Sequence, residues 1–144
     1  MNPFQSLSDY ETYIYQLTSQ FAVIQRSTLV LIRRGATVAV LSGELNFDRG
    51  IRLNIRERLT FERSPGTIRE YGYEVWQNDK LLYWYDSQPH PGDASLASTH
   101  PHHKHIPPDI KHHRIPAMGL SFEQPNLPFL VQEIIDLELE PYLR

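Results

Sequence analysis

An alternation of apolar and polar residues between Ser27 and Asp86 constrains the fold of this chain more than any other feature. The alternation predicts strands at residues 28–33, 37–47, 51–62, 68–77 and 81–86. Short turn-forming stretches separate these strands, and such connections join antiparallel neighbours, because a parallel crossover needs roughly a dozen or more residues. Residues 27–86 are therefore expected to form an antiparallel meander of about five strands.

Helical periodicity flanks this meander. Residues 8–25 carry apolar side chains at helical spacing, and Ser8 with Glu11 matches a capping box. A second helix is predicted over residues 127–140, where Asn126 is placed to cap the first turn. A segment rich in histidine and proline, residues 87–126, lies between the meander and this helix. We expect a single domain over residues 1–144 of the α+β class, with an antiparallel sheet, an N-terminal helix and a C-terminal helix.

Composition excludes several kinds of protein. The chain has no cysteine, which rules out disulfides, thiol chemistry and cysteine-ligated metal sites. It has no apolar run of the roughly 18 residues that a membrane span requires. The first residues lack the basic and apolar regions of a secretion signal. We therefore expect a cytoplasmic protein that does not associate with a membrane.

Positive charge is concentrated in the middle of the chain, and negative charge toward its C-terminal end. Arg52, Arg56 and Arg58 fall on one face of the strand predicted at 51–62, which gives that face a basic stripe. Such a stripe is typical of a surface that binds the phosphates of RNA, and Tyr73 is a candidate for stacking on a base. The alternatives are a solvated charged face and an aromatic side chain that packs in the core.

All seven histidines lie between His90 and His113, and the densest part reads His-His-Lys-His at residues 102–105. In an extended segment, His103 and His105 share one face, whereas His102 and Lys104 share the other. Asp86 ends the last predicted strand, and both Asp86 and His90 are expected to lie near this segment.

Three interpretations of this cluster are open. In the first, His103, His105, His90 and Asp86 bind a metal ion, although Lys104 would place a positive charge beside it. In the second, the histidines transfer protons while Lys104 stabilises a phosphate, as cleavage of RNA by its own 2′-hydroxyl requires. In the third, the histidines belong to a polar loop without chemical function.

The segment YEVWQNDKLLYWYDSQPHPGDASLASTHPHHKHIP resembles the TumE-type toxin family, which is associated with toxin–antitoxin gene pairs. The resemblance covers about residues 50–106 and rests on Tyr71, Tyr73, Tyr85-Asp86, Pro89-His90, and Pro101 through His105. It implies a toxin that a DNA-binding antitoxin with a helix-turn-helix domain neutralises, and RNA as a target.

We therefore expect a toxin that acts as a metal-independent endoribonuclease without a cofactor, and a homodimer is one possible assembly. The alternatives are a non-catalytic module that binds nucleic acid or protein, and a metal-dependent site with histidine ligands. The candidate catalytic residues are His103, His105, Lys104, His102, His90 and Asp86. The candidate RNA-binding residues are Arg52, Arg56, Arg58 and Tyr73.

Overall fold

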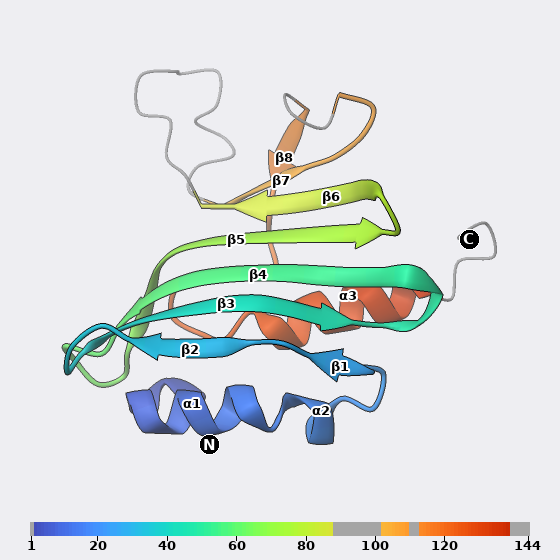
Figure 1. The fold of residues 1–144 in the computed structure, drawn as a ribbon. Helices are drawn as coiled ribbons and strands as arrows, with labels where there is room; N and C mark the ends of the chain where they lie inside the picture. Colours follow the sequence, from blue (N-terminus) through green and yellow to red (C-terminus); the bar gives the residue numbers. More distant parts are fainter. Residues whose placement is uncertain (1, 88–101, 110–112, 139–144) are drawn as a thin grey trace.

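The computed structural model describes residues 2–87, 102–109 and 113–138 (Figure 1). Its helices are α1 (Leu7–Tyr15), α2 (Leu17–Gln20) and α3 (Leu127–Glu138), with short 3-10 turns at Pro3–Gln5 and Asp48–Gly50. Its strands are β1 (Arg26–Ser27), β2 (Val30–Arg33), β3 (Val38–Asn46), β4 (Ile51–Thr60), β5 (Thr67–Gln77), β6 (Lys80–Asp86), β7 (His103–His105) and β8 (Arg114–Pro116). The α+β class is confirmed.

All strands belong to one antiparallel sheet in the order β1-β3-β4-β5-β6-β7-β8, and β2 pairs with β3 beside β1. The sheet thus has eight strands in the described residues, more than the expected five. Strands β2 to β6 correspond to the predicted meander. Of the additional strands, β7 lies in the segment that was considered above as extended, whereas β1 and β8 have only two and three residues, which is too short for alternation to be recognised.

The N-terminal helix differs from its expected form. Residues 8–25 were predicted to form one helix, but α1 ends at Tyr15, and α2 ends at Gln20. The chain then joins the sheet, where the Gln25 amide donates to Asn46 O at 2.8 Å. The cap is Ser6 and not Ser8, because Ser6 has an extended backbone and its Oγ accepts from the Asp9 amide at 3.0 Å.

The C-terminal helix begins at Leu127 as predicted, and the structure describes it as far as Glu138. Asn126 occupies the predicted position directly before the helix, but its side chain makes its hydrogen bonds elsewhere. The Asn126 side chain instead accepts from the Ser121 amide at 2.9 Å, and donates to Tyr73 OH at 3.0 Å. Its backbone oxygen accepts from the Leu130 amide at 3.1 Å and so begins the helical hydrogen bonds.

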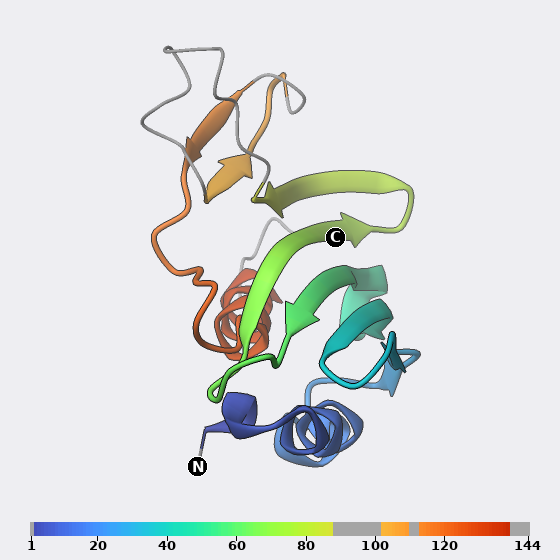
Figure 2. The same cartoon turned by 90° about the vertical axis from the view of Figure 1, so that its left-hand side faces the viewer.

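The helices pack on one face of the sheet, and the core lies between them (Figures 1 and 2). In Figure 1, α3 lies behind the strands and α1 runs along the end near β2. Most of the fully buried apolar side chains come from α1, α3 and the inward-facing positions of β3, β4 and β5, and Phe4 and Leu17 add to them from the first 3-10 turn and α2. In the described residues no helix covers the opposite face, which we call the open face (Figure 2). None of the described helices combines the length and the apolar character that crossing a membrane would need.

Candidate functional site

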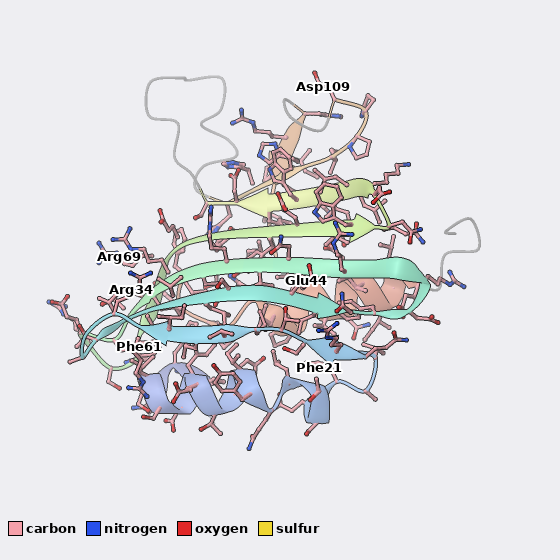
Figure 3. The ribbon with its side chains drawn as sticks, in the orientation of Figure 1. Phe21, Arg34, Glu44, Phe61, Arg69 and Asp109 are labelled. Carbon is pink, nitrogen blue, oxygen red and sulfur yellow. The ribbon has the colours of Figure 1, made fainter. Side chains whose placement is uncertain are left out.

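The strand register places one row of residues across the open face, roughly perpendicular to the strands. Each residue of this row is the direct partner of the next. The row consists of Ser42, Arg56, Gly72, Asp86, His103 and Pro116. A neighbouring row, two residues along each strand, consists of Glu44, Asn54, Glu74, Trp84, His105 and Arg114. Glu44, which is labelled in Figure 3, lies at the β3 end of this second row.

Asp86, His103 and His105 of these rows meet where β6 pairs with β7, and we call them the Asp-His-His cluster. Asp86 Oδ1 contacts His103 Nε2, and Asp86 Oδ2 lies 3.2 Å from His105 Nε2. The two imidazole rings meet nearly edge to face, with their centroids 5.2 Å apart. Both Nε2 atoms therefore point at the same carboxylate, as the predicted alternation of β7 required.

Burial differs within this cluster. The His103 side chain is 0% exposed and that of His105 is 4% exposed, whereas that of Asp86 is 28% exposed. The Trp84 ring packs against His105, with centroids 4.4 Å apart. The imidazoles are therefore held in place below the surface, and Asp86 is the member of the cluster whose side chain is partly exposed.

Arg56 lies two strands from the cluster, with Gly72 between them. One hollow of the open face is lined by Arg56, Arg58, Asp86 and Ser87, among others. A second hollow is lined by Asn54, Arg56, Gly72 and Glu74. Because glycine has no side chain, the floor between the Arg56 guanidinium and the Asp86 carboxylate is left open.

The three arginines predicted to bind RNA do share the open face, but they differ in their partners. Arg52 lies 3.7 Å from Glu44 Oε2 and 5.0 Å from the centroid of the Trp76 ring, and Arg58 lies 3.6 Å from Glu70 Oε1. Within the described part of the chain, Arg56 has neither an ion pair nor a hydrogen bond from its guanidinium. Of these three arginines, Arg56 is therefore the one best placed to bind an anion.

Lys104 and His102 lie on the helix-covered face, away from the cluster. Lys104 Nζ is 3.1 Å from Glu133 Oε2 of α3, and 4.3 Å from the centroid of the Tyr83 ring. His102 Nδ1 lies 2.6 Å from Tyr71 OH, and the two rings stack. The sheet separates both residues from His103 and His105, so one phosphate cannot contact the whole His-His-Lys-His block.

Tyr73 is also on the helix-covered face, and it is completely buried. Its hydroxyl donates to Glu57 Oε2 at 2.5 Å, so stacking on an RNA base is excluded in this structure. Tyr10 of α1 donates to the other oxygen, Oε1, also at 2.5 Å. Burial raises the pKa of Glu57, and the two tyrosine hydrogen bonds oppose this shift only in part.

Sequence reasoning missed three of these residues. Glu57 interrupts the apolar side of β4, and an acid at an inward-facing position was the signal that could have identified it. Gly72 and Arg114 are recognised only through the register, which places Arg114 opposite His105. His90, which was predicted to join the cluster, lies outside the described residues.

The family model described as Toxin TumE matches residues 14–137, which is most of the chain. This chain belongs to the TumE toxin family. The resemblance inferred from the motif at residues 73–107 is thereby confirmed, and it extends to parts of both flanking helices. No curated protein and no solved structure matches the chain.

Within the TumE match, the parts of the motif that the structure describes occupy adjacent strands. The tyrosines of the motif lie on β5, Asp86 ends β6, and the His-Lys-His sequence forms β7. Pro89, His90 and Pro101 lie outside the described residues. The motif residues Asp86, His103 and His105 thus converge on the open face, whereas Tyr71 and Tyr73 face the core.

Proposed function

We propose that this chain is the toxin of a toxin–antitoxin pair, and that it cleaves RNA at the open face of the sheet. Family membership supports the toxin part of the proposal. The observation that carries the RNA part is the row in which Arg56, Gly72, Asp86 and His103 lie side by side. This row combines an available cation, an open floor and a compact reactive cluster beside a hollow.

RNA carries its own nucleophile, so cleavage consumes no other reactant. The 2′-hydroxyl loses its proton and forms a bond to the adjacent phosphorus, while the bond from phosphorus to O5′ breaks and O5′ takes up a proton. The products are a 2′,3′-cyclic phosphate and a 5′-hydroxyl. The protein has to position the phosphate, stabilise its added negative charge, and assist the two proton transfers.

Arg56 is proposed to take the phosphate-binding role that sequence reasoning had given to Lys104. Its guanidinium can donate two parallel hydrogen bonds to a phosphate, which the ammonium of lysine cannot do. The open floor at Gly72 gives a phosphate room between Arg56 and Asp86. Arg52 and Arg58 are expected to contribute a weaker, longer-range attraction, because each has an acidic partner.

The buried histidines argue against the metal-independent form of this reaction. Direct proton transfer requires an imidazole nitrogen within hydrogen-bonding distance of the RNA. His103 and His105 are 0% and 4% exposed, and both Nε2 atoms face Asp86. The cluster therefore suits a role in which it holds another group that contacts the RNA.

Family membership also supports an antitoxin partner. We propose that this antitoxin carries a helix-turn-helix domain, and that a neighbouring gene encodes it. Expression of the toxin alone should then arrest growth, and coexpression of the neighbouring gene should restore it. Continued growth in cells that accumulate the folded toxin alone would refute the toxin assignment.

The test of RNA cleavage uses the untagged full-length protein, total RNA, and detection of new 5′-hydroxyl ends. Reactions with EDTA, with Zn²⁺ and with Mn²⁺ are run in parallel. We compare Arg56→Ala with Arg58→Ala, which removes a charge from the same face of the same strand. Arg56→Ala should slow cleavage by roughly tenfold or more, whereas Arg58→Ala should retain most of the activity.

Two results would overturn RNA cleavage at this site. Intact RNA at toxin concentrations that arrest growth would assign the toxicity to another activity, and RNA binding without cleavage would favour the non-catalytic module. An equal loss of cleavage activity in the Arg56→Ala and Arg58→Ala variants would show that Arg56 has no specific role.

A further inference from the structure

We infer that Asp86, His103 and His105 bind a divalent transition-metal ion such as Zn²⁺, which deepens the proposed function by naming its cofactor. One ligand atom from each residue lies within 4.8 Å of those of the other two. Ligands at about 2.0–2.2 Å from one zinc ion lie within roughly 4.4 Å of one another. The cluster therefore needs only small side-chain adjustments to close around an ion.

The donor atoms select the class of metal. Two imidazole nitrogens and one carboxylate oxygen suit zinc and neighbouring transition metals, whereas Mg²⁺ and Ca²⁺ prefer sites built from oxygen. Three protein ligands also leave a coordination position for water or substrate, as in catalytic zinc sites. Asp86, the most exposed of the three, lines the same hollow as Arg56, so this position opens toward the proposed phosphate site.

Regular secondary structure positions all three ligands. The pairing of β6 with β7 sets Asp86 directly opposite His103, and the two-residue period of β7 brings His105 to the same side. Trp84, which lies directly opposite His105 on β6, packs against the His105 ring. Ligands held by two paired strands lose little conformational freedom when a metal binds, which favours affinity.

The structure removes the main objection to a metal at this site. Lys104 lies between the two histidines in sequence, and its charge was expected to repel a cation. Lys104 Nζ is instead 3.1 Å from Glu133 Oε2, on the helix-covered face. Its charge is therefore balanced on the side of the sheet away from the cluster. A bound metal would supply the electrostatic stabilisation of phosphate that was expected of Lys104.

The inference is tested by metal binding, independently of RNA. Untagged protein is stripped with a chelator and titrated calorimetrically with Zn²⁺, Mn²⁺ and Mg²⁺, and its metal content after purification is measured by elemental analysis. We expect about one equivalent of Zn²⁺ or Mn²⁺, no binding of Mg²⁺, and an increase in melting temperature with the bound metal.

Matched variants assign the ligands. Asp86→Asn and His105→Gln should each weaken metal binding by roughly tenfold or more. Glu74→Gln and His113→Gln apply the same changes to an acid on the open face and to an exposed histidine outside the cluster, and should leave binding unaltered. Circular dichroism confirms that each variant is folded.

The outcomes separate this inference from the proposed function. Absence of stoichiometric binding in the folded protein, or unchanged binding in both ligand variants, would overturn the metal site. RNA cleavage that persists in EDTA, in protein free of metal, would overturn the assignment of the metal as the cofactor and leave the ribonuclease intact. Stoichiometric binding in protein that does not cleave RNA would support the metal site and refute the ribonuclease.

Discussion

The two faces of the sheet each hold a carboxylate that two other side chains contact, but the surroundings of these carboxylates differ. Glu57 is completely buried and accepts hydrogen bonds from Tyr10 and Tyr73, two hydroxyls with high pKa values. Asp86 is partly exposed and faces two imidazoles. The Glu57 group links α1 to the sheet, whereas the Asp86 group opens toward a hollow. The same chemical group is thus expected to serve stability on one face and chemistry on the other.

The largest effect is expected from Asp86→Asn on the open face. The amide keeps the size of the carboxylate but loses its negative charge, which a metal ion held by the cluster requires. RNA cleavage should fall by roughly a hundredfold or more, while the free energy of unfolding of the metal-free protein changes little. Cleavage rates and urea denaturation in chelator measure the two quantities. A variant that unfolds easily would mean that Asp86 is a structural residue like Glu57.

The next largest effect is expected from Glu57→Ala on the helix-covered face. The change leaves the hydroxyls of Tyr10 and Tyr73 buried without their acceptor, and it creates a cavity beneath α1. The free energy of unfolding should fall by about 2–4 kcal/mol, measured by urea denaturation. Glu70→Ala, which removes an exposed acid from the neighbouring strand, is the control and should cost far less. An equal decrease in the free energy of unfolding in Glu57→Ala and Glu70→Ala would contradict the structural role of Glu57.

A smaller effect is expected when the floor of the open face is filled. In Gly72→Val, the nearest atom to a new Cβ is Nη2 of Arg56 at 3.6 Å, so the strand can accept the side chain. The valine would occupy the space between Arg56 and Asp86. RNA cleavage should slow by roughly tenfold, with metal affinity and stability retained. Unchanged cleavage would show that the phosphate does not lie over Gly72.

The sequence predicted much of the fold, because alternation and helical periodicity are local patterns. They located β2 through β6 and the first residue of α3, and they placed His103 and His105 on one face of β7 and Lys104 on the other. These local patterns could not predict which residues of adjacent strands are paired, because irregularities at Arg58/Leu59 and Val75/Trp76 shift the pairing.

The candidate site depends on that register. Alternation alone could not place Arg56 and Gly72 in line with Asp86, and it gave no reason to separate Arg56 from Arg52 and Arg58. Arg52 and Arg58 differ from Arg56 because each forms an ion pair with an acid on an adjacent strand. Tyr73 was a candidate for RNA binding because an aromatic side chain on a strand can stack on a base, although aromatic side chains on adjacent strands more often pack in the core.

The smallest effect is expected in the pH dependence of stability. Burial raises the pKa of Glu57 above its ordinary value of 4.5, so the folded protein binds this proton more tightly than the unfolded chain. The resulting stabilisation is fully present below the unfolded value and is lost as pH rises through the folded pKa. Glu57→Gln cannot ionise. Its stability relative to the wild type should therefore increase between pH 5 and pH 8, as measured by urea denaturation with chelator. Glu74→Gln is the control. A difference in the free energy of unfolding between Glu57→Gln and the wild type that stays constant across this pH range would contradict the prediction.

The contacts of β7 on both sides have an evolutionary consequence. Lys104 holds the strand against Glu133 of α3, and the flanking histidines hold it against Asp86. A substitution that reverses one charge of the Lys104–Glu133 pair would place two like charges about 3 Å apart and weaken the packing of β7 on α3, although neither residue contacts the cluster. In homologous chains, we therefore expect the residues at positions 104 and 133 to change together, and to do so only where the opposite face keeps its aspartate and histidines.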